Sequence, residues 1–251
     1  MKKPSYLCCT MHCICPEDYI WTETRKKCLK ASDEVCFEMD MDDPSLLMDI
    51  ASGMVNYDGK ALKEYFSDSD YHKVARYIAD SLHMDIAQFR QMKPAALQTI
   101  LSIKSVDCDA PVSYENNIMD EAKKLKKEII GLEEAREQLS LLDNLPADSI
   151  IAGLISLIDS NASEKATYKK LAALYKKQDL PALYQLILQS KEQGDNMDAF
   201  LDERNQRWIS RIVEKMDQCS VFFAVGAGHL WGESGLITLL RKEGYTVKPV
   251  R

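Results

Sequence analysis

The chain has 251 residues, of which 46% are hydrophobic, and this is enough to bury a sizeable core. Its net charge of -7 and pI near 5.3 offer no basic face to a phosphate backbone. This argues against nucleic acid and favours a peptide or another small-molecule substrate. The longest apolar run, Ile150 to Ile158, is under half of the roughly 20 residues that a membrane-spanning helix needs, so no transmembrane segment is predicted.

The first half of the chain begins with two predicted strands. Short apolar runs bounded by turn residues place them at Tyr6–Cys15 and Glu34–Asp40. An apolar stripe from Tyr71 to Leu82 behind the caps Ser67 and Asp68 then predicts a helix, and Pro94 suits the first turn of another.

The second half begins with a helical stripe at Ile118, Ala122 and Leu125, before a strand at Glu128–Glu133. Residues 134 to about 190 predict several short helices, and Asp195–Asp217 predicts one longer helix. Strands follow at Ser220–Val225 and at Tyr245–Val250, where Pro249 indicates a sheet edge.

These elements predict an α/β protein with a central mixed, largely parallel sheet, flanking helices and a helical subdomain. Strands at both ends of the chain can share one sheet only if the chain returns to it. We therefore expect a single domain over residues 1–251, with helical insertions at about 45–103 and 134–216.

The eight cysteines do not form the pattern of a secreted disulfide framework, because four of them crowd into eight residues. A soft-metal site in Cys8–Cys15 is one interpretation. Neighbouring strand residues point to opposite faces, however, so these groups cannot all converge on one ion without an unusual turn. Buried thiols that act as small hydrophobic side chains are the favoured interpretation.

Two histidines follow short apolar strands at opposite ends of the chain. The last strand stops at Gly226, and His229 follows in a glycine-rich turn that also contains Gly228. Ligand crevices of open α/β sheets lie at such carboxyl ends of strands. His12 follows the first strand, and Glu38 lies within the second, where an unpaired carboxylate would be costly.

His12, Glu38 and His229 together are the kind of ligand set that hydrolytic metal sites use, because it leaves coordination positions for water. The alternative is that each histidine is structural. A shared site requires the strands before His12 and His229 to pair side by side in parallel, and the imidazole nitrogens to lie a few ångströms apart.

Arg204 lies on the apolar face of the predicted helix around Trp208, and a guanidinium there requires a carboxylate partner. Glu38 and Glu133 are the candidates. A buried structural ion pair and a functional pocket are both open interpretations.

Several segments together resemble the TraB/PrgY/GumN family, which includes the Tiki proteins. The matching segments are Gly226-Ala-Gly-His-Leu with the residues that follow, Pro4 to His12, Phe37-Glu38-Met-Asp, Gly131-Leu-Glu133 and Glu203-Arg-Asn205. The resemblance implies an α/β fold related to the erythromycin esterase and ChaN-like group. It also implies a divalent-metal-dependent peptidase activity that needs two Gly-x-x-His motifs and a glutamate.

On this resemblance, His12, Glu38 and His229 hold a manganese, cobalt or zinc ion, and the substrate is a peptide or related amide. Glu133 acts as general base or supports the ligands. Arg204 and Asn205 steady the oxyanion or the carboxylates. The alternative is a binding protein that holds a peptide or haem-like ligand in the same crevice without turnover. A purely structural module, with the histidines apart, is a third hypothesis.

One departure from the family pattern is Cys9, which stands where the first motif has glycine. Cysteine adds a Cβ and a thiol at a position where glycine permits positive φ, so the site is expected to be crowded, altered or inactive. Relatives of this kind are mostly exported, and no apolar stretch follows the lysines of Met1–Tyr6. We expect a bacterial cell-envelope or secreted location with the export signal absent from this chain, or a cytoplasmic location if the chain is full length.

Overall fold

The computed structural model describes residues 3–192 and 198–250. The chain divides into two compact units. The first contains Met1–Leu46, Cys108–Glu134 and Leu171–Arg251, and the second contains Leu47–Asp107 and Ala135–Lys170. The helical unit thus overlaps the two predicted insertions, but the chain after residue 170 groups with the sheet instead. Whether the two units form one domain stays a prediction.

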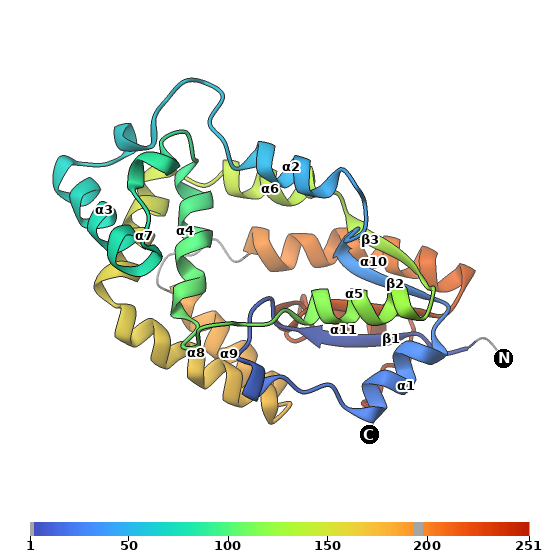
Figure 1. Cartoon of the computed structure of the whole chain (residues 1–251). Helices are drawn as coiled ribbons and strands as arrows, with labels where there is room; N and C mark the ends of the chain where they lie inside the picture. The colour runs from blue at the N-terminus through green and yellow to red at the C-terminus, as the bar shows by residue number, and fades with distance from the viewer. Residues whose placement is uncertain (1–2, 193–197, 251) are drawn as a thin grey trace. The chain divides into compact units, whose positions relative to one another are not determined.

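The first unit is built on four parallel strands in the order β1-β4-β2-β3 (Figure 1). These are β1 (Tyr6–Thr10), β2 (Glu34–Met39), β3 (Glu128–Glu133) and β4 (Val221–Gly226). The strand before His12 therefore pairs in parallel with the strand before His229, as predicted, and Thr10 lies opposite Gly226. The expectation of a mixed sheet was wrong, because β4 pairs in parallel with β1 and with β2, and β2 pairs in parallel with β3.

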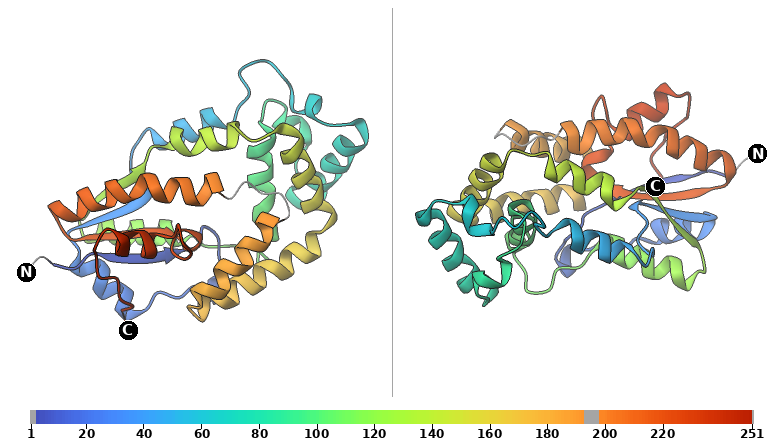
Figure 2. Two further views of the ribbon diagram at one scale, coloured as in Figure 1. Left: turned by 180° about the vertical axis from the view of Figure 1, so that it is seen from behind. Right: turned by 90° about the horizontal axis from the view of Figure 1, so that it is seen from above.

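Helices cover both faces of this sheet (Figure 2, right). One face packs against α1 (Glu23–Ala31) and α5 (Tyr114–Lys124), together with side chains of α8 (Asn161–Lys176) and α9 (Leu180–Glu192). The other face packs against α10 (Glu203–Gln218) and α11 (Leu236–Lys242). Buried on both faces, the strands consist largely of apolar residues, as parallel strands usually do.

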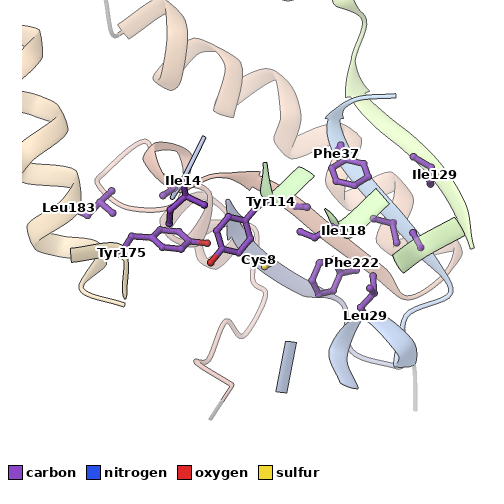
Figure 3. Packing of buried hydrophobic residues seen from close by; sticks show 14 residues of the cluster. Cys8, Ile14, Leu29, Phe37, Tyr114, Ile118, Ile129, Tyr175, Leu183 and Phe222 are labelled. Atoms are coloured by element: carbon purple, nitrogen blue, oxygen red, sulfur yellow. The ribbon is translucent and has the colours of Figure 1, made fainter. Parts of the chain in front are cut away.

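The core beneath β1 contains two tyrosines whose rings lie 5.2 Å apart, Tyr114 of α5 and Tyr175 of α8 (Figure 3). The Tyr175 hydroxyl donates to the backbone oxygen of Cys9 at 2.7 Å, and the Tyr114 hydroxyl donates to Ile20 O at 3.0 Å. Both buried hydroxyls are therefore satisfied.

The helical unit contains α2 (Leu46–Gly53, whose first residue belongs to the sheet unit), α3 (Asp68–Leu82), α4 (Pro94–Ser102), α6 (Ala135–Asp143) and α7 (Ala147–Asp159). Ser67 caps α3 by accepting from the Asp70 amide, as the sequence indicates. The core of the helical unit contains Leu62, Val74, Ile78, Ile86, Phe89, Leu97, Leu101 and Leu154. Among the described residues, no single helix is long and apolar enough to span a membrane, and α6 with α7 passes that test only as a pair bent by 90°.

Three predicted elements differ from the structure. The first strand ends at Thr10, and the segment after it turns away to make an isolated antiparallel bridge between Ile14 and Val112. The predicted strand Tyr245–Val250 is unpaired, because the segment folds back on α11, where the Tyr245 amide donates to Leu240 O.

The third element is the predicted helix Asp195–Asp217. Residues 195–197 lie outside the described residues, a π-helix covers Asp198–Asp202, and α10 begins at Glu203. Short 3-10 helices complete the chain at Pro16–Asp18, Leu62–Tyr65, Ile86–Phe89, Ile103–Ser105 and Ala227–His229.

Candidate functional site

A pocket of about 360 Å³ lies at the carboxyl ends of β1, β2 and β4, within the sheet unit. Its polar side chains are Thr10, His12, Glu38, Arg204 and His229. The rest of the lining is mostly apolar and comes from Met11, Leu171, Leu183, Ile187, Phe200 and Leu201. The sheet topology thus brings the two predicted histidines and Glu38 to one pocket, where α/β proteins commonly bind ligands.

Arg204 is the centre of a buried ion-pair cluster, and its side chain is only 5% exposed. Its Nη2 atom donates to Glu38 Oε2 and to Glu133 Oε1, both at 2.6 Å, and its Nε donates to Glu133 Oε1 at 3.0 Å. Its Nη1 donates to Phe200 O at 3.1 Å and lies 3.2 Å from His229 Nε2. These contacts use all five N–H groups of the guanidinium. Arg204 therefore binds the carboxylates, and has no N–H left for an oxyanion.

Glu133 is fully enclosed by donors. Besides its bonds to Arg204, its Oε2 accepts from Trp208 Nε1 at 3.0 Å, and its side chain is buried. Both oxygens are therefore occupied by protein donors, which fits the supporting role predicted for Glu133 better than the role of general base. Trp208 also lies under the Arg204 guanidinium at 4.6 Å.

Asn205 fixes the orientation of His229. Its Nδ2 donates to two backbone oxygens, His229 O at 3.1 Å and Ser234 O at 2.8 Å. Because carbonyls only accept, this sets which end of the amide is oxygen, and that Oδ1 lies 2.8 Å from His229 Nδ1. The hydrogen of a neutral His229 is therefore on Nδ1, and Nε2 is an unprotonated acceptor, with Arg204 Nη1 as its donor at 3.2 Å. Asn205 thus positions His229 and does not face an oxyanion.

His229 is neutral at ordinary pH, because burial lowers the pKa of its imidazole to about 4. Glu38 is ionised. Burial opposes this, but His229, which is protonated at the low pH where Glu38 titrates, and the Arg204 guanidinium lower the pKa of Glu38 to about 2. Glu38 Oε1 accepts from the Gly226 amide at 2.8 Å and lies 3.7 Å from His229 Nε2.

Two of the motif glycines differ in what they do. A Cβ on Gly226 would lie 3.2 Å from Glu38 Oε1, so glycine here allows the carboxylate to reach the strand end. A Cβ on Gly228 would meet Leu201 only at 3.4 Å, which is ordinary contact.

His12 lines the same pocket but makes its ion-pair contact outside the Glu38–His229 pair. Its side chain is 71% exposed, and its Nδ1 lies 3.0 Å from Oε1 of Glu115. The Glu115 carboxylate raises the pKa of His12. No sequence pattern pointed to Glu115 as a partner of His12, so this contact was missed. Within residues 3–192 and 198–250, no three His, Cys, Asp or Glu side chains are arranged to hold a metal ion.

The Glu38–His229 pair nevertheless has the donor chemistry of a cation site. Two buried carboxylates, Glu38 and Glu133, face one guanidinium, Arg204, and a neutral imidazole, which leaves one net negative charge beside the pocket. The unprotonated Nε2 and Glu38 Oε1 are 3.7 Å apart, which is compatible with two ligands at about 2.0 to 2.2 Å from one ion. These donor types suit a divalent ion, but Arg204 Nη1 would have to leave Nε2, and His12 would need to complete the set.

Cys9 does not disturb the sheet. It is the fourth of the five residues of β1, lies opposite Val225, and is not among the non-glycine residues with positive φ. The backbone here therefore does not require glycine, and whether the Cys9 thiol alters the site stays a prediction. The interpretation of the clustered cysteines as buried free thiols was wrong for Cys15, because Cys15 and Cys108 form a disulfide that ties the segment after His12 to the segment before α5.

The fold and the pocket define an α/β protein in which a parallel sheet presents a buried histidine and carboxylate at the carboxyl ends of its strands. The chain belongs to the TraB/PrgY/gumN family, whose model matches residues 1–249.

The chain is similar to several animal proteins named metalloproteases. It is 24% identical to Metalloprotease TIKI2 of Danio rerio, over 98% of this chain and 58% of that protein. It is 23% identical to Metalloprotease TIKI1 of Homo sapiens, over 98% of this chain and 59% of that protein. It is 22% identical to the Metalloprotease TIKI homolog of Amphimedon queenslandica, over 97% of this chain and 59% of that protein. The chain thus spans under two thirds of these relatives. No solved structure matches it significantly.

Proposed function

We propose that this chain is a peptidase-like hydrolase whose reaction centre is the pocket between the ends of β1, β2 and β4. The observation that carries the proposal is the buried pair of Glu38 and His229, with an unprotonated imidazole nitrogen 3.7 Å from a carboxylate oxygen. The names of the TIKI relatives support the same class of reaction.

In this proposal Glu38, His229 and His12 hold a divalent ion, which is manganese, cobalt or zinc. When bound, such an ion polarises a carbonyl and lowers the pKa of a coordinated water. Asn205 keeps the His229 tautomer that leaves Nε2 unprotonated, and Arg204 with Glu133 fixes the Glu38 carboxylate.

The apolar part of the pocket supports a peptide as substrate. Its wall consists of side chains from α8, α9 and the π-helix, among them Leu183, Ile187 and Phe200. An apolar substrate side chain held against this wall would gain burial, and its backbone amide would lie near the polar floor.

The test combines metal analysis with peptide hydrolysis. Protein purified without chelator is analysed for bound metal and then assayed on an unbiased peptide mixture with added manganese, cobalt or zinc. We expect near-stoichiometric metal, and loss of both metal and cleavage in His229→Gln and Glu38→Gln. The exposed His72→Gln in α3 is the matched histidine control and should change neither. Absence of bound ion, and of any shift in melting temperature with all three metals, contradicts the metal-dependent reaction.

The rival function is binding of a peptide or haem-like ligand without turnover. The observation that favours it is that Arg204 already occupies Glu38 Oε2 at 2.6 Å. Ligand binding that depends on the pocket residues, with no cleavage under any metal condition, is the outcome expected of the rival.

We further propose an oxidising location, in the cell envelope or outside the cell. Its support is the disulfide between Cys15 and Cys108, since disulfides persist mainly in such compartments. Thiol titration of denatured, unreduced protein from its source should give six thiols, because the other cysteines are unbridged. Eight thiols favour the cytoplasm.

A further inference from the structure

Glu115 is a buried carboxylate that none of the roles above uses. It lies in the first turn of α5, its side chain is 10% exposed, and its Oε1 is 3.0 Å from Nδ1 of His12. Its Oε2 accepts from Ser113 Oγ at 2.9 Å. Oε1 completes no regular hydrogen bond among the described residues, the His12 contact included. A buried carboxylate oxygen is costly to leave without a donor, and the donors at hand are His12 Nδ1 and the Thr10 hydroxyl.

The backbone around this contact is cross-linked. The Ile14 amide donates to Val112 O at 2.9 Å, and the Val112 amide donates to Ile14 O at 2.8 Å. The disulfide between Cys15 and Cys108 joins the same two segments. His12 lies in an irregular loop after β1, so these links, rather than the sheet, set its position.

We infer that Glu115 is the positioning residue of His12: it binds the Nδ1 side of the imidazole and thereby leaves Nε2 for a divalent ion in the pocket. The inference rests on the proposed function. A ligating histidine commonly donates its other ring N–H to a carboxylate, which fixes the tautomer and the ring orientation. His229 offers a comparison, because its Nδ1 lies 2.8 Å from the amide oxygen Oδ1 of Asn205.

A purely structural role for Glu115 makes a different prediction. A carboxylate in the first turn of α5 favours the helix through its charge, and this needs no particular distance to His12. Glu115→Asp keeps that charge but withdraws it from His12 by one methylene group. The positioning role predicts that this variant loses metal affinity, and the helix role predicts that it does not.

The experiment measures Co²⁺ and Mn²⁺ binding to the full chain by titration calorimetry at fixed pH, for wild type, Glu115→Gln, Glu115→Asp and His12→Gln. Glu121→Gln is the matched control, because Glu121 is a half-exposed carboxylate on the same helix that pairs with Lys124 and not with His12. We expect both Glu115 variants to bind the metal about 10 to 100-fold more weakly, the control to be unchanged, and Glu115→Gln in a His12→Gln background to add nothing. Thermal melts confirm that each variant is folded.

The outcomes separate the two proposals. Wild-type binding that is unchanged in Glu115→Asp overturns the positioning role and leaves the metal site intact. Binding that depends on Glu38 and His229 but not on His12 overturns it too. A wild-type protein that binds neither ion removes the metal site itself, and the positioning role with it.

Discussion

Replacing Arg204 by methionine tests whether the buried cluster is held together by charge. The substitution keeps much of the apolar side-chain volume and removes the donors to Glu38 and Glu133, two of them at 2.6 Å. It leaves two carboxylates buried without their counter-ion. Breaking a buried ion pair in this way costs about 3 to 5 kcal/mol, which is a large part of the roughly 5 to 15 kcal/mol by which proteins are stable.

Urea unfolding of Arg204→Met at pH 7, followed by circular dichroism, measures this cost. Arg136→Met is the control, because that arginine is exposed and its contact with Asp49 is 3.7 Å. It should change the free energy of unfolding by less than about 0.5 kcal/mol. Adding Glu133→Gln to Arg204→Met should cost less than the sum of the single changes. A loss below about 1 kcal/mol for Arg204→Met refutes the view that both carboxylates are ionised around it.

Three further changes probe the same unit. The pKa of His229 is about 4 in the folded protein against an ordinary 6.5, so between these pH values only the unfolded chain binds this proton. The free energy of unfolding should therefore fall as the pH drops from 6.5 to 4, by up to about 1.4 kcal/mol per pH unit. In urea melts at a series of pH values, His229→Gln should flatten this pH dependence. Trp208→Phe removes the indole donor 3.0 Å from Glu133 and should cost about 1 to 3 kcal/mol in the same melts, whereas no loss contradicts that bond. Cys15→Ser removes a disulfide that links residues 93 apart and should lower the free energy of unfolding by about 2 to 4 kcal/mol. Treating the wild type with dithiothreitol should lower it equally if this disulfide is present.

The strands of the sheet were predictable because buried parallel strands are short apolar runs, and β3 (Glu128–Glu133) has the predicted bounds. Tyr245–Val250 resembles such a run, yet its apolar residues Tyr245 and Val247 pack against the α11 side of the core without strand pairing. The local hydrophobic pattern indicates which residues are buried. Strand pairing also requires that a free strand edge lies beside the segment. The pairing of Cys15 with Cys108 is beyond sequence spacing for the same reason.

The pocket residues were predictable to different degrees. Arg204 was informative because a guanidinium on an apolar helical face needs a carboxylate, and both candidates, Glu38 and Glu133, contact it. Asn205 was found, but its contact with His229 depends on the turn after β4. The contact of Glu115 with His12 was missed, because it joins an irregular loop to a helix end over a distance that no periodicity describes.

The two histidines are therefore anchored in physically different ways. His229 follows β4 directly and is buried, and its partner Asn205 lies on α10, the helix that also carries the Arg204 ion pairs. His12 is exposed, and the strand before it ends two residues earlier, so its position depends on Glu115 and on the links between its loop and the segment before α5. Local loops open at lower free energy than buried strands and helices. Any ligand that needs both imidazoles thus couples the stability of a loop to that of the sheet, and loosening that loop should weaken binding without unfolding the sheet.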